Sequence, residues 1–256
     1  MDWDDLYQEL ERWRAMDRAA TLWWRDDDAA DGTPALARLL DAAERAGAPL
    51  ALAVVPATAT EALVRAVNPA RGVSILQHGY AHTNHAGPGA RAIECGGDRP
   101  VETVLSELSH GRRRLVELFA DRFRPVLVPP WNRIDDAVAG RIAEAGFSGL
   151  STWGRRPATA AAVGVVAVNT HADLIAWRSG RRFAGVGKVL GEIVRHLADR
   201  REGRADPSEP TGILTHHLDH DEAGWAFLGE LTLRLGDHPA ARWIDVDAAF
   251  GFERAR

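Results

Sequence analysis

The sequence predicts an α/β fold in the form of a distorted (β/α) barrel with about seven parallel strands. Short apolar runs alternate with amphipathic helical segments along the whole chain, a pattern typical of parallel strands joined by helices. Seven or eight such strands within 256 residues fit a barrel better than an open sheet. Polar residues follow several of the apolar runs directly, and the carboxyl ends of strands are where a barrel of this kind carries its chemistry.

The chain is expected to begin with a helix that does not belong to the barrel. Residues 4–16 have a helical apolar pattern, so residues 1–20 are predicted to form an N-terminal helical extension packed on the outside. The barrel domain is then expected to span residues 21–256.

Capping residues and prolines mark the boundaries of the next elements. Thr33 is a helix N-cap, Pro34 is suited to the first helical position, and Gly47 ends that helix. Pro56 ends a continuous apolar run that is typical of a buried strand. The expected helices are 34–46, 61–67, 101–120, 134–145, 183–200 and 222–235. The expected strands are 21–24, 50–55, 73–76, 126–128, 148–152, 163–168, 211–215 and 243–246.

Composition excludes several classes of protein. The net charge of -5 argues against nucleic acid or an anionic membrane as the main partner. No run approaches the roughly 20 apolar residues of a membrane span. The single cysteine, Cys95, excludes an intramolecular disulfide and a zinc site built from several cysteines. The acidic start of the chain lacks the features of a signal peptide, so a cytoplasmic protein is expected.

Carboxylates and histidines gather after the first and third predicted strands. Asp26, Asp27 and Asp28 are consecutive and repel one another, so they require a cation or wide exposure to solvent. His78 and His82 are four residues apart, and one helical turn would place both imidazoles on the same face. Neutral imidazole is a good ligand for zinc and similar metals. The ends of the first and third predicted strands therefore offer metal ligands.

Two further candidates have more than one interpretation. His85 is either a third histidine ligand or, as we favour, a group that supports the site or faces the substrate. His171 and Asp173 follow a later apolar strand, with Trp177 close behind. They either line the same pocket or belong to a capped loop, and His171 is taken as a substrate-binding residue.

Two clusters near other strand ends suggest a pocket wall and a proton donor. The rigid segment Pro129–Pro130 is followed by Trp131, which either shapes the pocket or packs in the core. His216 follows a strand and is suited to act as a general acid near neutral pH. Strand alternation sends His217 to the opposite side.

Taken together, the clusters supply the parts of a catalytic metal site. One aspartate and two histidines give three protein ligands and leave positions open for water and substrate. A neighbouring carboxylate can take a proton from the activated water, and a histidine on another strand can protonate the leaving group.

This order of clusters resembles the polysaccharide deacetylases, the NodB-homology or carbohydrate esterase family 4 group. In that family an Asp-Asp pair closes the first strand, a His-x-x-x-His motif follows the third, and an Arg/Pro-rich motif and a late Leu-x-His complete the site. The matching residues here are Asp-Asp within 26–28, His78 to His82, 123–125 with 129–131, and 214–216. The resemblance covers about residues 21–250. It implies a NodB-like barrel and a metal-dependent hydrolase that removes N-acetyl or O-acetyl groups.

The sequence departs from the family pattern at two places. The family's Thr-Phe-Asp-Asp-Gly is Arg-Asp-Asp-Asp-Ala here, so two registers are open. Either Asp26 is the base and Asp27 the ligand, or, as we favour, Asp27 is the base and Asp28 the ligand. The Ser or Thr that normally follows the first histidine is Gly79, so one orienting hydroxyl is missing.

The resulting hypothesis is a deacetylase-like hydrolase that acts on a sugar or another linear or cyclic amide. Asp28, His78 and His82 would hold one divalent metal, with zinc the expected ion. Asp27 would be the base, His216 the acid, and Pro130, Trp131, His85 and His171 the substrate-binding residues; Trp153 is a further candidate for an apolar wall. The substrate is expected to be a carbohydrate or small molecule. A sugar-binding barrel that has lost turnover and a purely structural protein are the alternatives.

Overall fold

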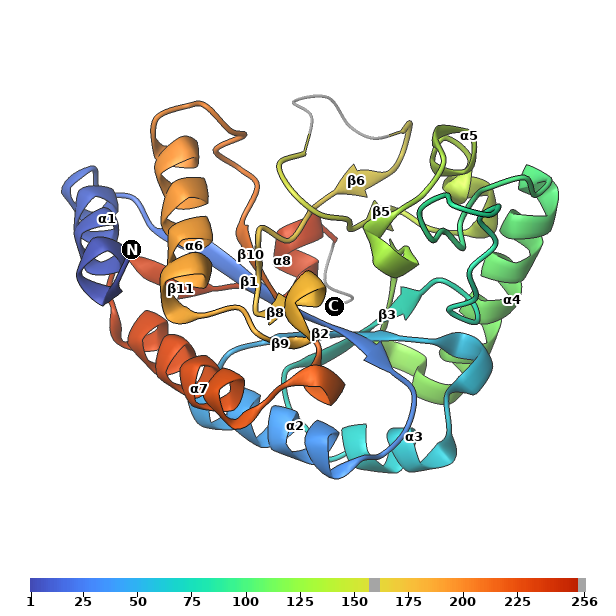
Figure 1. Ribbon diagram of the computed structural model, residues 1–256, viewed down its shortest axis with the longest axis horizontal. Coiled ribbons are helices and arrows are strands. Elements are labelled where there is room, and N and C mark those ends of the chain that lie inside the picture. The colour runs from blue at the N-terminus through green and yellow to red at the C-terminus, as the bar shows by residue number, and fades with distance from the viewer. Residues whose placement is uncertain (157–161, 253–256) are drawn as a thin grey trace.

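The computed structural model describes residues 1–156 and 162–252. A nine-stranded sheet dominates this part of the chain and curls into a half-barrel, with helices around it (Figure 1). The strand order is β6-β5-β4-β3-β2-β1-β10-β7, and every pairing in this sheet is parallel. β11 pairs with the first residues of β1. The predicted fold class is therefore confirmed, with more strands than expected because several are only two or three residues long.

The barrel strands and the helices have the following bounds. The strands are β1 (Ala20–Ala29), β2 (Leu50–Val54), β3 (Val73–His78), β4 (Phe123–Val128), β5 (Gly149–Leu150), β6 (Val166–Ala167), β7 (Ala172–Asp173), β10 (Thr211–Thr215) and β11 (Ala241–Trp243). The helices are α1 (Trp3–Ala15), α2 (Pro34–Ala46), α3 (Glu61–Val67), α4 (Val101–Phe119), α5 (Asp136–Ala139), α6 (Val186–Arg201), α7 (Glu222–Asp237) and α8 (Val246–Phe250). A separate antiparallel pair consists of β8 (Ile175–Ala176) and β9 (Arg182–Phe183).

β1 lies in the middle of the sheet and separates two apolar layers. Trp24 packs in the core between the sheet and its outer helices, whereas Trp23 packs in the barrel interior with Phe250 of α8. Successive side chains of a strand point to opposite faces, so two adjacent tryptophans serve both layers. Both indole N–H groups are satisfied, by the carbonyl of Asn169 and the hydroxyl of Thr215. These two hydrogen bonds tie β1 to residues on both of its sides.

The first helix packs on the outside of the barrel against α6 (Figure 1). It begins at a capping box formed by Asp2 and Asp5. Its buried face, Leu6, Leu10 and Trp13, joins the same core as the outer barrel helices. The helix lies where the sequence predicts, and the division of the chain at residue 20 stays a prediction.

Several expected elements differ from those observed; the strands expected at 148–152 and 163–168, for example, form only as β5 and β6. The first strand continues through all three carboxylates to Ala29, because its far end is still paired with β2. The helix expected at 134–145 is wrong: only α5 and a short 3-10 turn at Ile142–Ala145 form there. The strand expected at 243–246 ends at Trp243, since Asp245 caps α8 through the N–H of Ala248. Residues 157–161 and 253–256 of the expected barrel domain lie outside the described residues.

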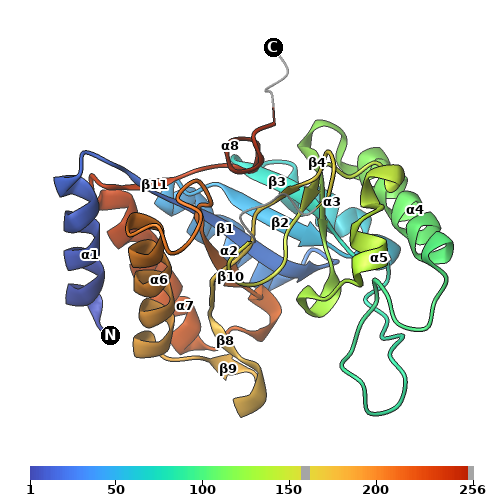
Figure 2. The same ribbon diagram turned by 90° about the horizontal axis from the view of Figure 1, so that it is seen from above.

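The two ends of the barrel carry different structures. The β8–β9 pair and the long loop between β3 and α4 project on one side, and α8 lies on the other (Figure 2). Because the strands are parallel, the first side is where their carboxyl ends meet. In the described part of the chain, no helix combines the length and apolar character needed to cross a membrane.

Candidate active site

A distortion near the end of β1 places two successive aspartates on the same side. The pairing of β1 with β2 shifts register between Asp26 and Ala29, and Asp28 has a φ of 71°. A bulge of this kind re-aims side chains that would otherwise alternate. Asp28 consequently meets the histidines after β3, while Asp27 faces His216 after β10.

Asp28 and two histidines converge within the reach of one cation. The Oδ1 atom of Asp28 lies 3.0 Å from Nε2 of His78 and 3.2 Å from Nε2 of His82. These three ligand atoms all lie within 4.8 Å of one another. His78 is 2% exposed, whereas Asp28 and His82 are each about a third open to solvent. The group is therefore anchored in the protein interior at His78 and accessible to solvent at Asp28 and His82.

The protonation of His78 leaves a lone pair aimed at this group. Its Nδ1 atom lies 3.0 Å from the carbonyl oxygen of Val128, which can only accept, so Nδ1 carries the hydrogen. In neutral His78 the Nε2 lone pair then faces a carboxylate oxygen that is buried and has no hydrogen-bond partner. Two acceptors this close require a proton or a metal cation between them. The donor set of one carboxylate and two imidazoles fits zinc.

The charges of the group perturb each other strongly. Burial opposes ionisation of Asp28, but the close imidazoles of His78 and His82 outweigh it and hold the pKa of Asp28 below its usual value. Burial likewise opposes protonation of His78, but Asp28 and Asp27 raise the pKa of His78 above its usual value. Both shifts express the demand for positive charge at this point.

The route from His78 to His82 is not the helical turn that the spacing suggests. His78 is the last residue of β3, and the chain then enters a loop in which Gly79 and His82 both have a φ of 55°. The two rings end 5.2 Å apart, tilted by 42°. A loop, rather than the expected helical turn, therefore brings the two imidazoles together.

Asp27 is held by Arg25 from the same strand. The guanidinium of Arg25 donates from Nε and Nη2 to the two oxygens of Asp27, at 2.8 and 2.9 Å. Arg25 also donates to Ser151 Oγ and to Asn132 Oδ1, each at 2.7 Å. Residues 25 and 27 share one face of the strand, which the sequence spacing indicates, but Ser151 after β5 and Asn132 after β4 come from distant segments.

His216 lies between Asp27 and a second carboxylate. Its Nε2 atom is 4.0 Å from Asp27 Oδ2, and its Nδ1 atom is 3.9 Å from Asp173 Oδ1. Trp177 packs edge-on against the His216 ring at 4.6 Å and donates its indole N–H to Asp173 at 2.7 Å. Burial raises the pKa of Asp173 against the opposing effect of His216. The sequence indicates Asp173 and Trp177 as possible pocket residues, but it does not show that they lie beside His216.

Asp26 and His217 form a separate buried pair. Nδ1 of His217 lies 2.5 Å from Asp26 Oδ1, and Thr215 and the backbone N–H of His217 donate to Oδ2. Burial opposes protonation of His217, but Asp26 outweighs it and raises its pKa. The register in which Asp26 is the base and Asp27 the ligand does not fit these distances.

The residues expected to bind substrate are placed unequally. Trp131 lies beside His82, with ring centroids 4.5 Å apart. Pro130 is buried and packs against Gly79, below the loop. The backbone of His85 is held by Ile93, and no ring contact joins His85 to Asp28, His78 or His82 among the described residues. Trp153 is 41% exposed on a neighbouring loop.

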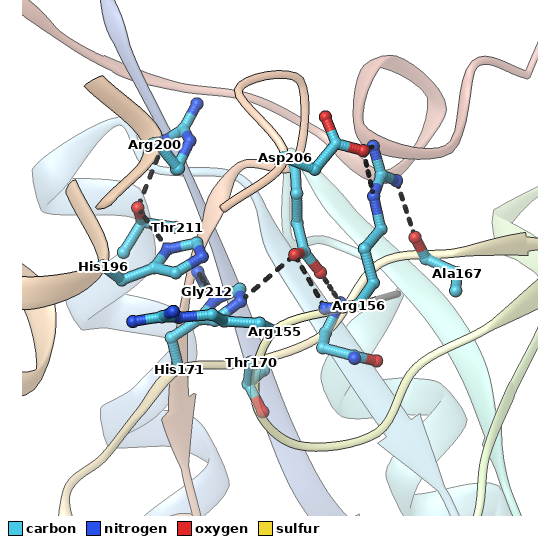
Figure 3. Close-up of polar contacts among 12 residues, drawn as sticks. Arg155, Arg156, Ala167, Thr170, His171, His196, Arg200, Asp206, Thr211 and Gly212 are labelled. Atoms are coloured by element: carbon cyan, nitrogen blue, oxygen red, sulfur yellow. Dashed lines mark hydrogen bonds and ion pairs between the residues drawn. The ribbon is translucent and has the colours of Figure 1, made fainter. Parts of the chain in front are cut away.

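His171 belongs to a different cluster at the other end of β7. It stacks on His196, with ring centroids 3.3 Å apart and planes tilted by 15°, near Glu209 and Arg200 (Figure 3). The backbone N–H of Gly212 donates to its Nδ1, so in neutral His171 the proton is on Nε2. His171 therefore does not join Asp28, His78 and His82, whereas Asp173, two residues on, lies beside His216, and the substrate-binding role of His171 stays a prediction.

His171 and His196 form a stacked, buried pair beside Glu209. The ligand atoms of the three residues lie within 4.8 Å of one another, but Nδ1 of His171 accepts from Gly212 N–H and Nδ1 of His196 lies 2.9 Å from Thr211 Oγ1. Both oxygens of Glu209 already accept backbone N–H groups. Burial lowers the pKa of His171, and it lowers the pKa of His196 to about 2.

Comparison with known proteins identifies similarity in structure alone. No family model matches the sequence, and no curated protein matches it. A family 4 carbohydrate esterase from Streptomyces lividans aligns at a TM-score of 0.54 with 16% identity, covering 85% of this chain and 88% of that one. A CE4 esterase of Streptococcus mutans gives 0.56 and 14%, covering 89% and 87%.

The same architecture also occurs in a protein described as inactive. A CE4 family pseudoenzyme from Bacillus anthracis aligns at a TM-score of 0.56 with 12% identity, covering 93% of this chain and 67% of that one. At such identities the likeness establishes architecture, and the chemistry has to be argued from the residues present. The chain thus has the distorted (β/α) barrel fold of the carbohydrate esterase family 4 deacetylases.

Proposed function

We propose that this protein is a metal-dependent hydrolase that removes an acetyl group, or cleaves another non-peptide amide, on a sugar or small molecule. The observation that carries the proposal is the convergence of Asp28, His78 and His82 beside Asp27 and His216 at the carboxyl ends of the strands. Fold similarity to CE4 deacetylases agrees with it.

The proposed metal ligands are Asp28 Oδ1 and the Nε2 atoms of His78 and His82. A bound divalent cation, which we expect to be zinc, would supply Lewis acidity toward an acyl oxygen and increase the acidity of water. His78 is pre-oriented for this role by its bond to the Val128 carbonyl. His82 is the more exposed of the two histidines, and its ring lies beside Trp131.

The two remaining groups divide the proton transfers. Asp27 accepts the proton of the attacking water, and Arg25 keeps its carboxylate fixed while that happens. His216 donates a proton to the departing nitrogen or oxygen. Asp173 lies beside the opposite ring nitrogen of His216, where a carboxylate orients the imidazole and stabilises its charged form.

The substrate class is inferred from the walls of the site. Trp131 packs beside His82 and Trp177 packs beside His216, so an indole lies next to a histidine of each proposed role. Indole faces and edges of this kind suit the apolar faces of a sugar ring or a compact cyclic amide. We therefore propose a carbohydrate or small amide as substrate.

Metal analysis of matched variants tests the proposal. Purified wild-type protein should contain about one zinc-like ion per chain by inductively coupled plasma mass spectrometry after reconstitution. Asp28→Asn and His78→Ala should lose it while circular dichroism shows an intact fold. Asp41→Asn, an exposed acid on α2, is the control and should retain the metal.

Activity is then measured on a panel of N-acetyl sugars, O-acetyl sugars, cyclic imides and ureides. Turnover that requires both the ion and His216 would support the proposal and select the substrate class. Ligand binding without turnover would instead support a non-catalytic barrel; one protein of similar structure is described as a pseudoenzyme. Wild-type protein that retains no ion from several divalent metals would refute the metal centre.

A further inference from the structure

One buried carboxylate outside the proposed catalytic set holds the loop that carries His82. Glu94 lies in the long segment between β3 and α4 and is 2% exposed. Its Oε2 accepts the backbone N–H of Tyr80 at 3.0 Å. Its Oε1 accepts the N–H groups of Ala81 at 2.7 Å and Thr83 at 3.2 Å. The three donors flank His82 on both sides in sequence.

This loop has a backbone that does not form readily on its own. His82 has a φ of 55°, a left-handed conformation that costs a residue with a side chain about 1–2 kcal/mol. Successive N–H groups directed to one point form a concave anion site. Glu94 occupies that site and gives the strained conformation three charge-assisted hydrogen bonds.

The charge of Glu94 is satisfied by these backbone groups. Arg99 is the nearest basic residue with a contact to Glu94, but its Nη1 donates to the Glu94 main-chain carbonyl rather than to the carboxylate. Arg99 is paired with Glu107. In the described residues, the hydrogen bonds that the Glu94 carboxylate accepts therefore all come from the loop.

Gly79 makes room for this arrangement. A Cβ atom at residue 79 would lie 1.8 Å from Glu94 Oε2 and 2.6 Å from Pro130 Cδ. Because Gly79 has no side chain where a Ser or Thr is expected, the carboxylate of Glu94 occupies the space that such a side chain would take. Gln77 secures the other side by donating to the Gly79 carbonyl at 2.8 Å.

We propose that Glu94 is a positioning residue of the metal centre, which holds the Nε2 atom of His82 in place opposite Asp28 and His78. The proposal rests on the proposed metal site and adds a residue to its support. A loop already fixed in the ligating conformation loses less conformational freedom when the cation binds. Removing the carboxylate frees the loop and weakens binding of the ion.

The experiment measures Zn²⁺ affinity of metal-free protein by competition with a chromogenic chelator, in the wild type, Glu94→Gln and Glu94→Ala. Glu94→Gln keeps the shape but turns an N–H donor toward a backbone N–H. We expect its Zn²⁺ affinity to fall about 10- to 100-fold, with a larger loss in Glu94→Ala. Glu117→Gln, an exposed acid on α4, is the matched control and should stay within about twofold.

Two further readouts separate positioning from a general effect on folding. Thermal unfolding of the metal-free proteins should show Glu94→Gln still folded, and the visible spectrum of the Co²⁺-loaded variant should differ from that of the wild type because the ligand geometry is altered. If Glu94→Gln is unfolded, Glu94→Asp, which retains the charge on a shorter stem, replaces it and should lose affinity in the same direction.

The outcomes distinguish this inference from the proposed function. Wild-type protein that binds Zn²⁺, with unchanged affinity in folded Glu94 variants, would overturn the role of Glu94 and leave the metal centre standing. Wild-type protein that binds no divalent cation would overturn both. Reduced affinity together with an altered Co²⁺ spectrum would establish the positioning role.

Discussion

The pair formed by Arg25 and Asp27 gives the sharpest test of how the site is stabilised. Arg25 is fully buried and Asp27 is 2% exposed, and two hydrogen bonds of 2.8 and 2.9 Å join them. In the variant Arg25→Met, the carboxylate stays buried without its cation, which costs about 3–5 kcal/mol. Ser151 and Asn132 also lose their donor, at about 1 kcal/mol each.

The expected loss of unfolding free energy in Arg25→Met is therefore about 5–7 kcal/mol, which is comparable with the whole stability of many domains. The double variant Arg25→Met/Asp27→Leu removes both charges and leaves only the two lost hydrogen bonds, about 2 kcal/mol. The double variant should thus be more stable than the Arg25→Met single variant.

Urea unfolding of the metal-free proteins, followed by tryptophan fluorescence and circular dichroism, measures these differences. Coincident transitions of the two probes establish that one free energy describes each variant. An Arg25→Met loss below about 2 kcal/mol, or a double variant as unstable as the sum of the two single variants, would refute the reasoning. Either result would mean that the pair is solvated, or that Arg25 and Asp27 contribute independently to the free energy of unfolding.

Three further predictions concern catalysis and pH. His216→Ala should lower kcat about 10²- to 10⁴-fold with unchanged metal content; an equal loss of metal would instead make His216 a ligand. Trp131→Ala should raise KM more than it lowers kcat, and steady-state kinetics on the preferred substrate would expose the reverse. Burial lowers the pKa of His196 to about 2, so, as pH falls, this histidine takes up a proton in the unfolded chain before it does so in the folded protein. The free energy of unfolding therefore decreases as pH drops below about 6.5, by about 1.4 kcal/mol per pH unit for this group. His196→Gln should lack this component when urea unfolding is compared at pH 6.5 and pH 5; an identical pH dependence in both proteins would contradict it.

Much of the fold could be predicted because its signals are local. Thr33, Pro34 and Gly47 bound α2 where they are expected, since capping and left-handed termination depend on residues close in the chain. The helix expected at 134–145 fails for the opposite reason: its apolar spacing is helical, but in the fold only short turns form there. Two-residue strands such as β7 have no pattern of their own and exist through their pairing with β10.

The candidate site also has features that the sequence predicts and features that it does not. That carboxylates and histidines gather near the ends of β1, β3 and β10 is visible in the sequence, because strand ends are marked by where apolar runs stop. Which aspartate faces which histidine is not visible, because alternation along β1 is broken at Asp28 by a bulge. Likewise, His171 and Asp173 are indistinguishable in the sequence, and only their register on β10 sends Asp173 to the site.

The sequence alone determined the order of elements, the barrel class and the chemical character of the strand ends, since each depends on the periodicity and type of neighbouring residues. The tertiary structure alone decided the pairing of Arg25 with Ser151 and Asn132, and the capture of the 79–83 loop by Glu94. These contacts join segments that are distant in sequence or lie in irregular loops. Their geometry follows from how the whole chain packs, which no local pattern encodes.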